Sequence, residues 1–289
     1  MKAAFPPLLM LAASALALAA CDPAVEETDD VTEDVTAIDP QLAKAVKAER
    51  RGSNAKRDEY RNPYRTLEFF QLAPDQTVIE YAPGSGWYTQ ILAPYLADEG
   101  QYIAVSFAPD AVDSLNQDFR DRLHEGGETF AARQSRALGI EEAKLPFYFG
   151  DSVPDSLDGK VDRVLIVRMM HNLMRWDIAE SEIATLRDTL APGGMIGVVQ
   201  HRAPPDAEDE FTDGNAGYLR EADVIAFFEA NGFELAGSSE VNANPRDTAD
   251  HEAGVWTLPP TLALGDRDRD KYKEIGESDR MTLLFSKTE

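Results

Sequence analysis

The chain of 289 residues carries 52 acidic and 28 basic side chains, and its formal net charge is −24. Nucleic-acid binding requires clustered lysine and arginine, and anionic lipid head groups repel an acidic surface, so this balance argues against both as partners. A single cysteine, Cys21, excludes an internal disulfide, and no His-x-x-x-His or paired-cysteine spacing indicates a metal site.

The N-terminus has the pattern of an export signal. Lys2 precedes an apolar run from Leu8 to Ala20, which is short for a membrane-spanning helix. The run ends in Leu-Ala-Ala-Cys, which resembles a bacterial lipobox, and this resemblance implies that Cys21 is acylated as the first residue of the mature protein. We therefore expect a signal peptide over residues 1–20 and a lipid anchor on the periplasmic side of a membrane, with Asp22 favouring the inner membrane. The alternative is an ordinary signal peptide that contains a cysteine.

An acidic segment follows, from residue 21 to residue 40. It contains eight acidic side chains and no basic or aromatic one. Such a segment cannot bury enough apolar surface to order itself, so we expect a disordered tether. Residues 41–289 are long enough for one α/β domain with a substantial core.

Strands and helices alternate along that domain. Apolar or alternating runs predict strands over residues 77–81, 102–107, 146–149, 161–168, 195–200, 233–241 and 281–287. Helical patterns fall over residues 41–51, 57–71, 87–97, 111–123, 128–138, 177–190 and 221–231. This order predicts a Rossmann-like, three-layer α/β fold with a mostly parallel sheet of seven strands. The last two strands lack a full helix between them, so the last strand should be antiparallel.

The strand that ends at Glu80 leads into a glycine-containing turn and then a helix. Glycines at such a junction allow a ligand to approach the backbone, and the start of the helix offers free N–H groups. The spacing Glu80-x-Ala82-x-Gly84-x-Gly86 resembles the acidic-x-Gly-x-Gly-x-Gly motif of class I methyltransferases, with alanine at the first glycine. A dinucleotide-binding turn would instead need glycine in place of Thr89. The alternative is a structural turn that binds no ligand.

Longer motifs extend the resemblance to most of the chain. They include Pro-Gly-x-Gly-Trp-Tyr-Thr at residues 83–89, Gly-Val-Trp-Thr-Leu-Pro-Pro at 254–260 and Ile-Gly-Glu-Ser-Asp-Arg-Met at 275–281. Together these segments resemble a bacterial family of predicted methyltransferases, many of them exported, over about residues 40–289. The resemblance implies the class I fold with S-adenosylmethionine as cofactor. It implies no particular methyl acceptor.

By this resemblance, the cofactor is held at the carboxyl edge of the sheet. The turn packs against the methionine part of the cofactor, which implicates Glu80, Ala82, Gly84 and Gly86. An acid that holds the ribose usually ends the second strand, whereas this chain has Ser106 there, and a serine makes one weaker hydrogen bond. Asp151, after the third strand, has the position that meets the adenine amino group, or it is an ordinary loop aspartate.

Polar residues follow the fourth and fifth strands. His171 and Asn172 come after the fourth strand, and His201 comes after the fifth. Ligands bind at the carboxyl ends of parallel strands, so these three side chains are candidates for the catalytic site, with His171 as the proton acceptor. The alternative for His171 is packing in the apolar core.

Two further segments are expected to border this pocket. Residues 242–280 form a long insertion between the last two strands, and loops of this length in compact domains are usually lids or binding loops. The Arg57–Pro63 segment is expected to close the pocket from the other side. Within the insertion, Arg280 is expected to pair with Asp279 or Glu277.

The sequence leaves two functions open. The first is an S-adenosylmethionine-dependent methyltransferase that acts on a small molecule or an envelope component. The second is a non-catalytic or repurposed lipoprotein that binds a small ligand in the same pocket. Export favours the second, because the cofactor is made and kept in the cytoplasm. The presence of Glu80, Gly84 and Gly86 favours the first.

Overall fold

The computed structural model describes residues 39–288 of the chain. The predicted signal peptide, Cys21 and nearly all of the predicted tether therefore lie outside the described residues. Within residues 39–288, no helix combines the length and the apolar character needed to cross a membrane.

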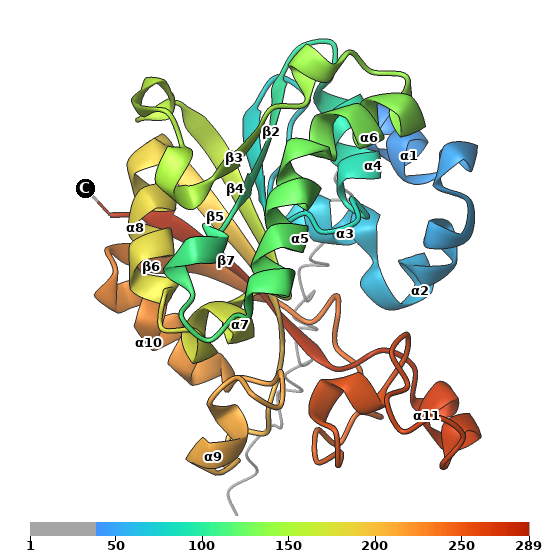
Figure 1. The fold of residues 1–289 in the computed structure, drawn as a ribbon. Helices are drawn as coiled ribbons and strands as arrows, with labels where there is room; N and C mark the ends of the chain where they lie inside the picture. The colour runs from blue at the N-terminus through green and yellow to red at the C-terminus, as the bar shows by residue number, and fades with distance from the viewer. Residues whose placement is uncertain (1–38, 289) are drawn as a thin grey trace, which may run out of the picture. The chain divides into compact units, whose positions relative to one another are not determined.

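The described residues fold around a seven-stranded sheet (Figure 1). Its strands are β1 (Thr77–Tyr81), β2 (Gln101–Ser106), β3 (Phe147–Phe149), β4 (Val161–Val167), β5 (Leu190–His201), β6 (Phe233–Ser239) and β7 (Arg280–Lys287). Their order across the sheet is β3-β2-β1-β4-β5-β7-β6. Pairs among β1 to β5 are parallel, whereas β7 runs antiparallel to both β5 and β6. The predicted fold class, a mostly parallel sheet with an antiparallel last strand, is confirmed.

Both faces of the sheet are buried, which explains why its central strands are apolar at nearly every position. Ile79 of β1 pairs with Ile103 of β2 and with Val164 of β4, and all three belong to one core. Their neighbours Val78 and Leu165 belong to a second core. Because successive side chains of a strand point to opposite faces, the two cores lie on the two sides of the sheet.

Helices supply the outer layers on both sides. The second core receives side chains from α1 (Pro40–Val46), α3 (Pro63–Phe69), α4 (Thr89–Leu96) and α6 (Phe130–Leu138). The first core receives side chains from α7 (Met170–Arg175), α8 (Ala179–Thr189) and α10 (Glu221–Ala230). The other helices are α2 (Asp58–Arg61), α5 (Gln117–Glu128), α9 (Asp209–Thr212) and α11 (Arg269–Ile275).

Three helix predictions are wrong at their boundaries. The helix predicted over residues 41–51 ends at Val46, and a 3₁₀ segment follows over Glu49–Arg57. The other two differ for local reasons. The helix predicted over residues 57–71 breaks at Asn62, whose φ is 37°, because Pro63 disfavours helical backbone in the residue before it. The helix predicted over residues 111–123 begins later, as α5. The Oδ1 atom of Asn116 accepts a hydrogen bond of 2.9 Å from the backbone three residues on, and this cap starts the helix.

Residues 242–280 run between β6 and β7, with α11 on the same side of the sheet as α2 (Figure 1). The insertion contains a short 3₁₀ turn, Gly254–Thr257, as well as α11. Its first residue is fixed, because Asn242 Nδ2 donates to Thr66 Oγ1 and to Thr282 Oγ1, at 2.9 Å each. These bonds tie the insertion to α3 and β7.

Candidate functional site

The turn after β1 holds three residues in left-handed backbone, with φ values of 51° at Ala82, 57° at Gly84 and 87° at Gly86. A Cβ atom at Gly84 would meet no heavy atom within 4 Å, whereas one at Gly86 would overlap with the side chain of Gln134 on α6. The turn is therefore open at Gly84 and filled at Gly86. The Ala82 N–H donates to Val105 O at 2.7 Å, so pairing with β2 continues one bond beyond β1 before the chain turns.

A cavity of about 380 Å³ opens beside Gly84. Its lining residues come from the segments 54–61, 82–87, 167–175 and 255–256 and from His201. The strands β1, β4 and β5 end at this cavity, which is the edge where parallel sheets bind ligands. A larger hollow of about 560 Å³ lies beside Arg202 and α10, but no predicted site residue lines it. The smaller cavity is therefore the candidate site.

His171 lines the cavity from α7, and its tautomer follows from its partner. Gln200 donates through Nε2 to Gly217 O at 2.8 Å, so Gln200 Oε1 is the acceptor that lies 3.2 Å from His171 Nδ1. Nδ1 thus carries the proton, and Nε2 is the free acceptor. Burial lowers the pKa of His171 to about 4; the bond to Gln200 opposes this, and the charges of Arg175 and Arg168 add to it. The imidazole is therefore neutral at pH 7.

His201 and Asn172 line the same cavity as His171. The ring centroids of the two histidines are 5.6 Å apart, and His201 Nδ1 lies 2.6 Å from Ser278 Oγ. Burial lowers the pKa of His201 well below its ordinary value, and the charges of His171 and Arg168 lower it further. The three predicted catalytic residues are thus brought together around one cavity. Their catalytic role stays a prediction.

Four arginines also line the cavity. Arg57 and Arg61 come from the segment that was expected to close the pocket, whereas Arg168 and Arg175 were not predicted. Arg168 directly follows β4, has a φ of 56°, and donates its N–H to Val199 O at 2.6 Å. It is the last residue of the strand predicted over residues 161–168, and a charged residue at the carboxyl end of an apolar run is the sequence signal that could have identified it.

Glu277 of the insertion binds three of the arginines in this region. Its Oε1 lies 2.6 Å from Arg57 Nε, and its Oε2 lies 3.1 Å from Arg61 Nε and 3.3 Å from Arg280 Nη1. Burial raises the pKa of Glu277, but Arg61, Arg280 and Arg57 together outweigh burial and lower the pKa below its ordinary value. Glu277 is therefore charged at neutral pH. The guanidinium of Arg61 also lies 4.7 Å from the ring centroid of Trp87, so α2 and the insertion are held against the glycine turn.

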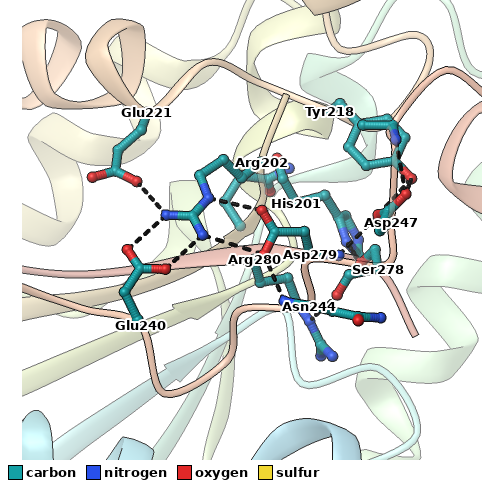
Figure 2. Close-up of polar contacts among 12 residues, drawn as sticks. His201, Arg202, Tyr218, Glu221, Glu240, Asn244, Asp247, Ser278, Asp279 and Arg280 are labelled. Carbon is teal, nitrogen blue, oxygen red and sulfur yellow. Dashed lines mark hydrogen bonds and ion pairs between the residues drawn. The ribbon is translucent and has the colours of Figure 1, made fainter. Parts of the chain in front are cut away.

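Arg202 fixes both ends of the insertion to the end of β5 (Figure 2). Its Nε lies 2.8 Å from Asp279 Oδ2, its Nη2 lies 2.6 Å from Glu240 Oε2, and its Nη1 lies 3.0 Å from Glu221 Oε2. Glu240 follows β6, and Asp279 precedes β7. This cluster holds the segment that presents Ser278 to His201.

The architecture is similar to that of solved structures of other proteins. No protein-family model and no curated protein matches the chain. Among solved structures, a SAM dependent methyltransferase from Aquifex aeolicus aligns with a TM-score of 0.51 and 15% identity, over 86% of this chain and 97% of that chain. The chain has the class I methyltransferase fold. The [4+2]-cyclase SpnF also aligns, with a TM-score of 0.51 and 15% identity over 86% of this chain and 94% of its own. Because a cyclase shares the fold, the reaction has to be argued from the site.

In this methyltransferase fold, Glu80 of the acidic motif lies beneath the turn. It is 4% exposed, and its Oε2 accepts hydrogen bonds from Thr89 Oγ1 and from Tyr102 OH, both at 2.7 Å. The acceptor role expected for this carboxyl is thus filled by hydroxyls of the protein itself. Glu80 is not one of the cavity-lining residues found within residues 39–288.

The other predicted cofactor positions divide into two groups. Ala82 and Gly84 line the cavity. Ser106 ends β2, Asp151 is exposed in the turn after β3, and Gly86 faces Gln134, and these three do not line the cavity described for residues 39–288. The structure therefore brings two of the four residues expected at the methionine end, Ala82 and Gly84, together with the catalytic candidates. The expected ribose and adenine contacts stay predictions.

Proposed function

We propose that the protein is an S-adenosylmethionine-dependent methyltransferase that acts on a small molecule or an envelope component. One observation carries the proposal: the turn with the class I spacing opens, at Ala82 and Gly84, onto the cavity that also receives His171, Asn172 and His201. Two motifs more than eighty residues apart in the sequence thus border one open cavity, at the edge where this fold type binds ligands.

The residues present fit the cofactor at the turn. Gly84 leaves the space that a Cβ would occupy free of any heavy atom within 4 Å, so the backbone is open to a bound amino acid group. Glu80, Ala82, Gly86, Ser106 and Asp151 are the further positions that we assign to cofactor binding. S-adenosylmethionine, when bound, supplies an electrophilic methyl group.

The two histidines supply the acid–base chemistry in this proposal. His171 Nε2 is unprotonated at pH 7 and accepts the proton that the acceptor atom loses on methylation. Asn172 orients the acceptor through its amide, and His201, held by Ser278, assists from the other wall of the cavity. His171→Ala should therefore slow turnover and leave the dissociation constant of S-adenosylhomocysteine unchanged.

The direct test is calorimetric titration of the full chain with S-adenosylmethionine and S-adenosylhomocysteine. We expect saturable binding that is lost in Gly84→Leu. Gly159→Leu is the matched control, because Gly159 has a similar φ of 66° and equally open surroundings but lies away from the cavity. Dissociation constants weaker than millimolar for both ligands would refute the proposed methyltransferase function.

The proposal also includes the location of the protein in the cell envelope. We propose that acylated Cys21 anchors the protein on the periplasmic side of the membrane, with the inner membrane favoured, so that the domain meets small molecules or envelope components there. Radiolabelled palmitate should enter the wild-type protein and not the Cys21→Ser variant. Labelling that persists in Cys21→Ser would contradict the anchor.

A second function has an observation in its favour. The expected ribose and adenine positions, Ser106 and Asp151, lie outside the cavity lining described for residues 39–288, and Glu80 already has two partners. These facts suit a lipoprotein that binds a small ligand in this cavity without transferring a methyl group. Transfer of radiolabel from S-adenosylmethionine to envelope extract or small-molecule pools, lost in His171→Ala, would decide for the enzyme.

A further inference from the structure

The cavity has the opposite charge to the protein around it. Four arginines line it, and no aspartate or glutamate of residues 39–288 does, although the full chain has 52 acidic side chains and a net charge of −24. Both histidines in the lining are neutral at pH 7 because burial lowers their pKa values. The lining of this cavity is therefore positive in a chain that is negative overall, which suits a negatively charged ligand.

Each of the four lining arginines also has one buried guanidinium nitrogen that lacks a partner in the described part of the chain. Buried Nη2 atoms of Arg57 and Arg61, and buried Nε atoms of Arg168 and Arg175, have no hydrogen-bond partner among residues 39–288. Arg61 is 2% exposed, so water cannot solvate it freely. A buried charged donor without an acceptor is costly, and such groups in a native protein call for an explanation. Among residues 39–288, six arginines have a buried nitrogen without a hydrogen-bond partner. Arg51 and Arg120 lie elsewhere, and the other four line the cavity.

The acids nearby do not balance these charges. Glu277 is shared by Arg57, Arg61 and Arg280, and Asp213 and Asp279 act only at a distance on Arg175 and Arg280. Arg168 makes no ion pair with any of residues 39–288; burial lowers its pKa to about 9, and the charges of Arg61 and Arg280 contribute. A positive charge is thus held at the end of β4 without a counter-charge of its own.

We propose that this cavity binds a small ligand through a compact anionic group, a phosphate or a carboxylate, which Arg57, Arg61, Arg168 and Arg175 hold together. We further assign this ligand as the methyl acceptor, a step that rests on the proposed function. S-adenosylmethionine carries an ammonium and a sulfonium against one carboxylate, so its arrival adds a net positive charge to an already positive site. We therefore assign the compensating negative charge to the acceptor.

The test uses inorganic phosphate as the probe, titrated into the full chain by calorimetry at low ionic strength. We expect saturable binding that weakens at least tenfold in Arg168→Gln, because a charge-assisted contact is lost. Arg163→Gln is the matched control: Arg163 is a buried arginine in the first half of β4, far from the end that Arg168 follows, and it donates to Phe70 O and does not line the cavity. Half-buried Arg175→Gln serves as the second variant if Arg168→Gln does not fold.

Two outcomes overturn the anion site: phosphate binding that is absent from the wild type, or an equal loss of affinity in the Arg163→Gln control. Repeating the titration with saturating S-adenosylhomocysteine separates the two possible sources of the anion. Unchanged phosphate affinity supports an acceptor group, whereas competition assigns the arginines to the cofactor's own carboxylate and overturns the acceptor assignment. Phosphate binding without any binding of S-adenosylhomocysteine would sustain the anion site and refute the methyltransferase.

Discussion

Replacing Glu80 by glutamine should remove a pH dependence that this one buried carboxyl imposes on the fold. Burial raises the pKa of Glu80 from 4.5 to about 7, despite hydrogen bonds from Thr89 and Tyr102 that favour the charged form. The folded protein therefore keeps this proton to higher pH than the unfolded chain. The stabilising contribution is complete below about pH 4.5, falls as the pH rises to about 7, and is constant above that. The full span corresponds to about 3 kcal/mol.

The assay is urea unfolding of the wild type and of Glu80→Gln between about pH 5 and pH 8. Glutamine retains an acceptor oxygen for the two hydroxyls and cannot ionise, so the variant's free energy of unfolding should rise relative to the wild type by up to about 3 kcal/mol over this range. Taking the difference between the two proteins cancels the titration of every other acid. Glu182→Gln gives a graded control, because burial raises the pKa of Glu182 only to about 6.

A difference that stays flat with pH would refute this reasoning. It would mean that the hydroxyls of Thr89 and Tyr102 hold Glu80 charged in the folded protein. A charged carboxylate beneath the turn would suit an ammonium ligand at the site, so this result would strengthen the cofactor role of Glu80 while removing the stability argument.

Three further substitutions test the local structure. Ala82→Gly should stabilise the fold by about 0.5–1 kcal/mol in urea unfolding, because glycine relieves the left-handed φ of 51° at a smaller entropic cost. Gly86→Ala should destabilise it by about 1–3 kcal/mol, since the new Cβ overlaps with Gln134, and shortening Gln134 should restore only part of the loss because the φ of 87° remains. Arg202→Gln should lower the free energy of unfolding by about 1–3 kcal/mol at pH 7 and by less at acid pH, because the hydrogen bond from Arg202 lowers the pKa of Glu240 and its contribution is lost as the pH falls; an equal loss at both would contradict an ionic role.

The fold could be predicted because its signals are local. β1 is found where the apolar run predicted it, at Thr77–Tyr81, since a strand buried on both faces is mostly apolar, as Val78, Ile79 and Tyr81 are. Helix ends were less predictable. Asn116 starts α5 through a single side-chain hydrogen bond. The helical sequence pattern extends to residues before Asn116, so the pattern alone predicts a start that is too early.

The site could be predicted only in part, for a related reason. Residues at the carboxyl ends of parallel strands or in the segment just beyond them, such as His201 and His171, are expected to converge at one edge, and they do. The pair between Arg57 and Glu277 joins residues 220 positions apart, and no local pattern identifies it. Glu80 could have been placed from strand alternation alone: it shares a face with Val78, toward α4, and so its side chain points to Thr89.

Ala82 and Arg168 occupy equivalent places after two neighbouring strands. Each has left-handed backbone, with φ values of 51° and 56°, and each donates its N–H to the next strand outward, to Val105 O at 2.7 Å and Val199 O at 2.6 Å. Such backbone costs a non-glycine residue about 1–2 kcal/mol. Strain of this kind persists where the surroundings enforce it, commonly at functional sites. Here it coincides with unpartnered guanidinium nitrogens around one cavity. An anion held by the four lining arginines binds only the folded chain, so it should raise the free energy of unfolding by mass action, and Arg168→Gln should remove that gain.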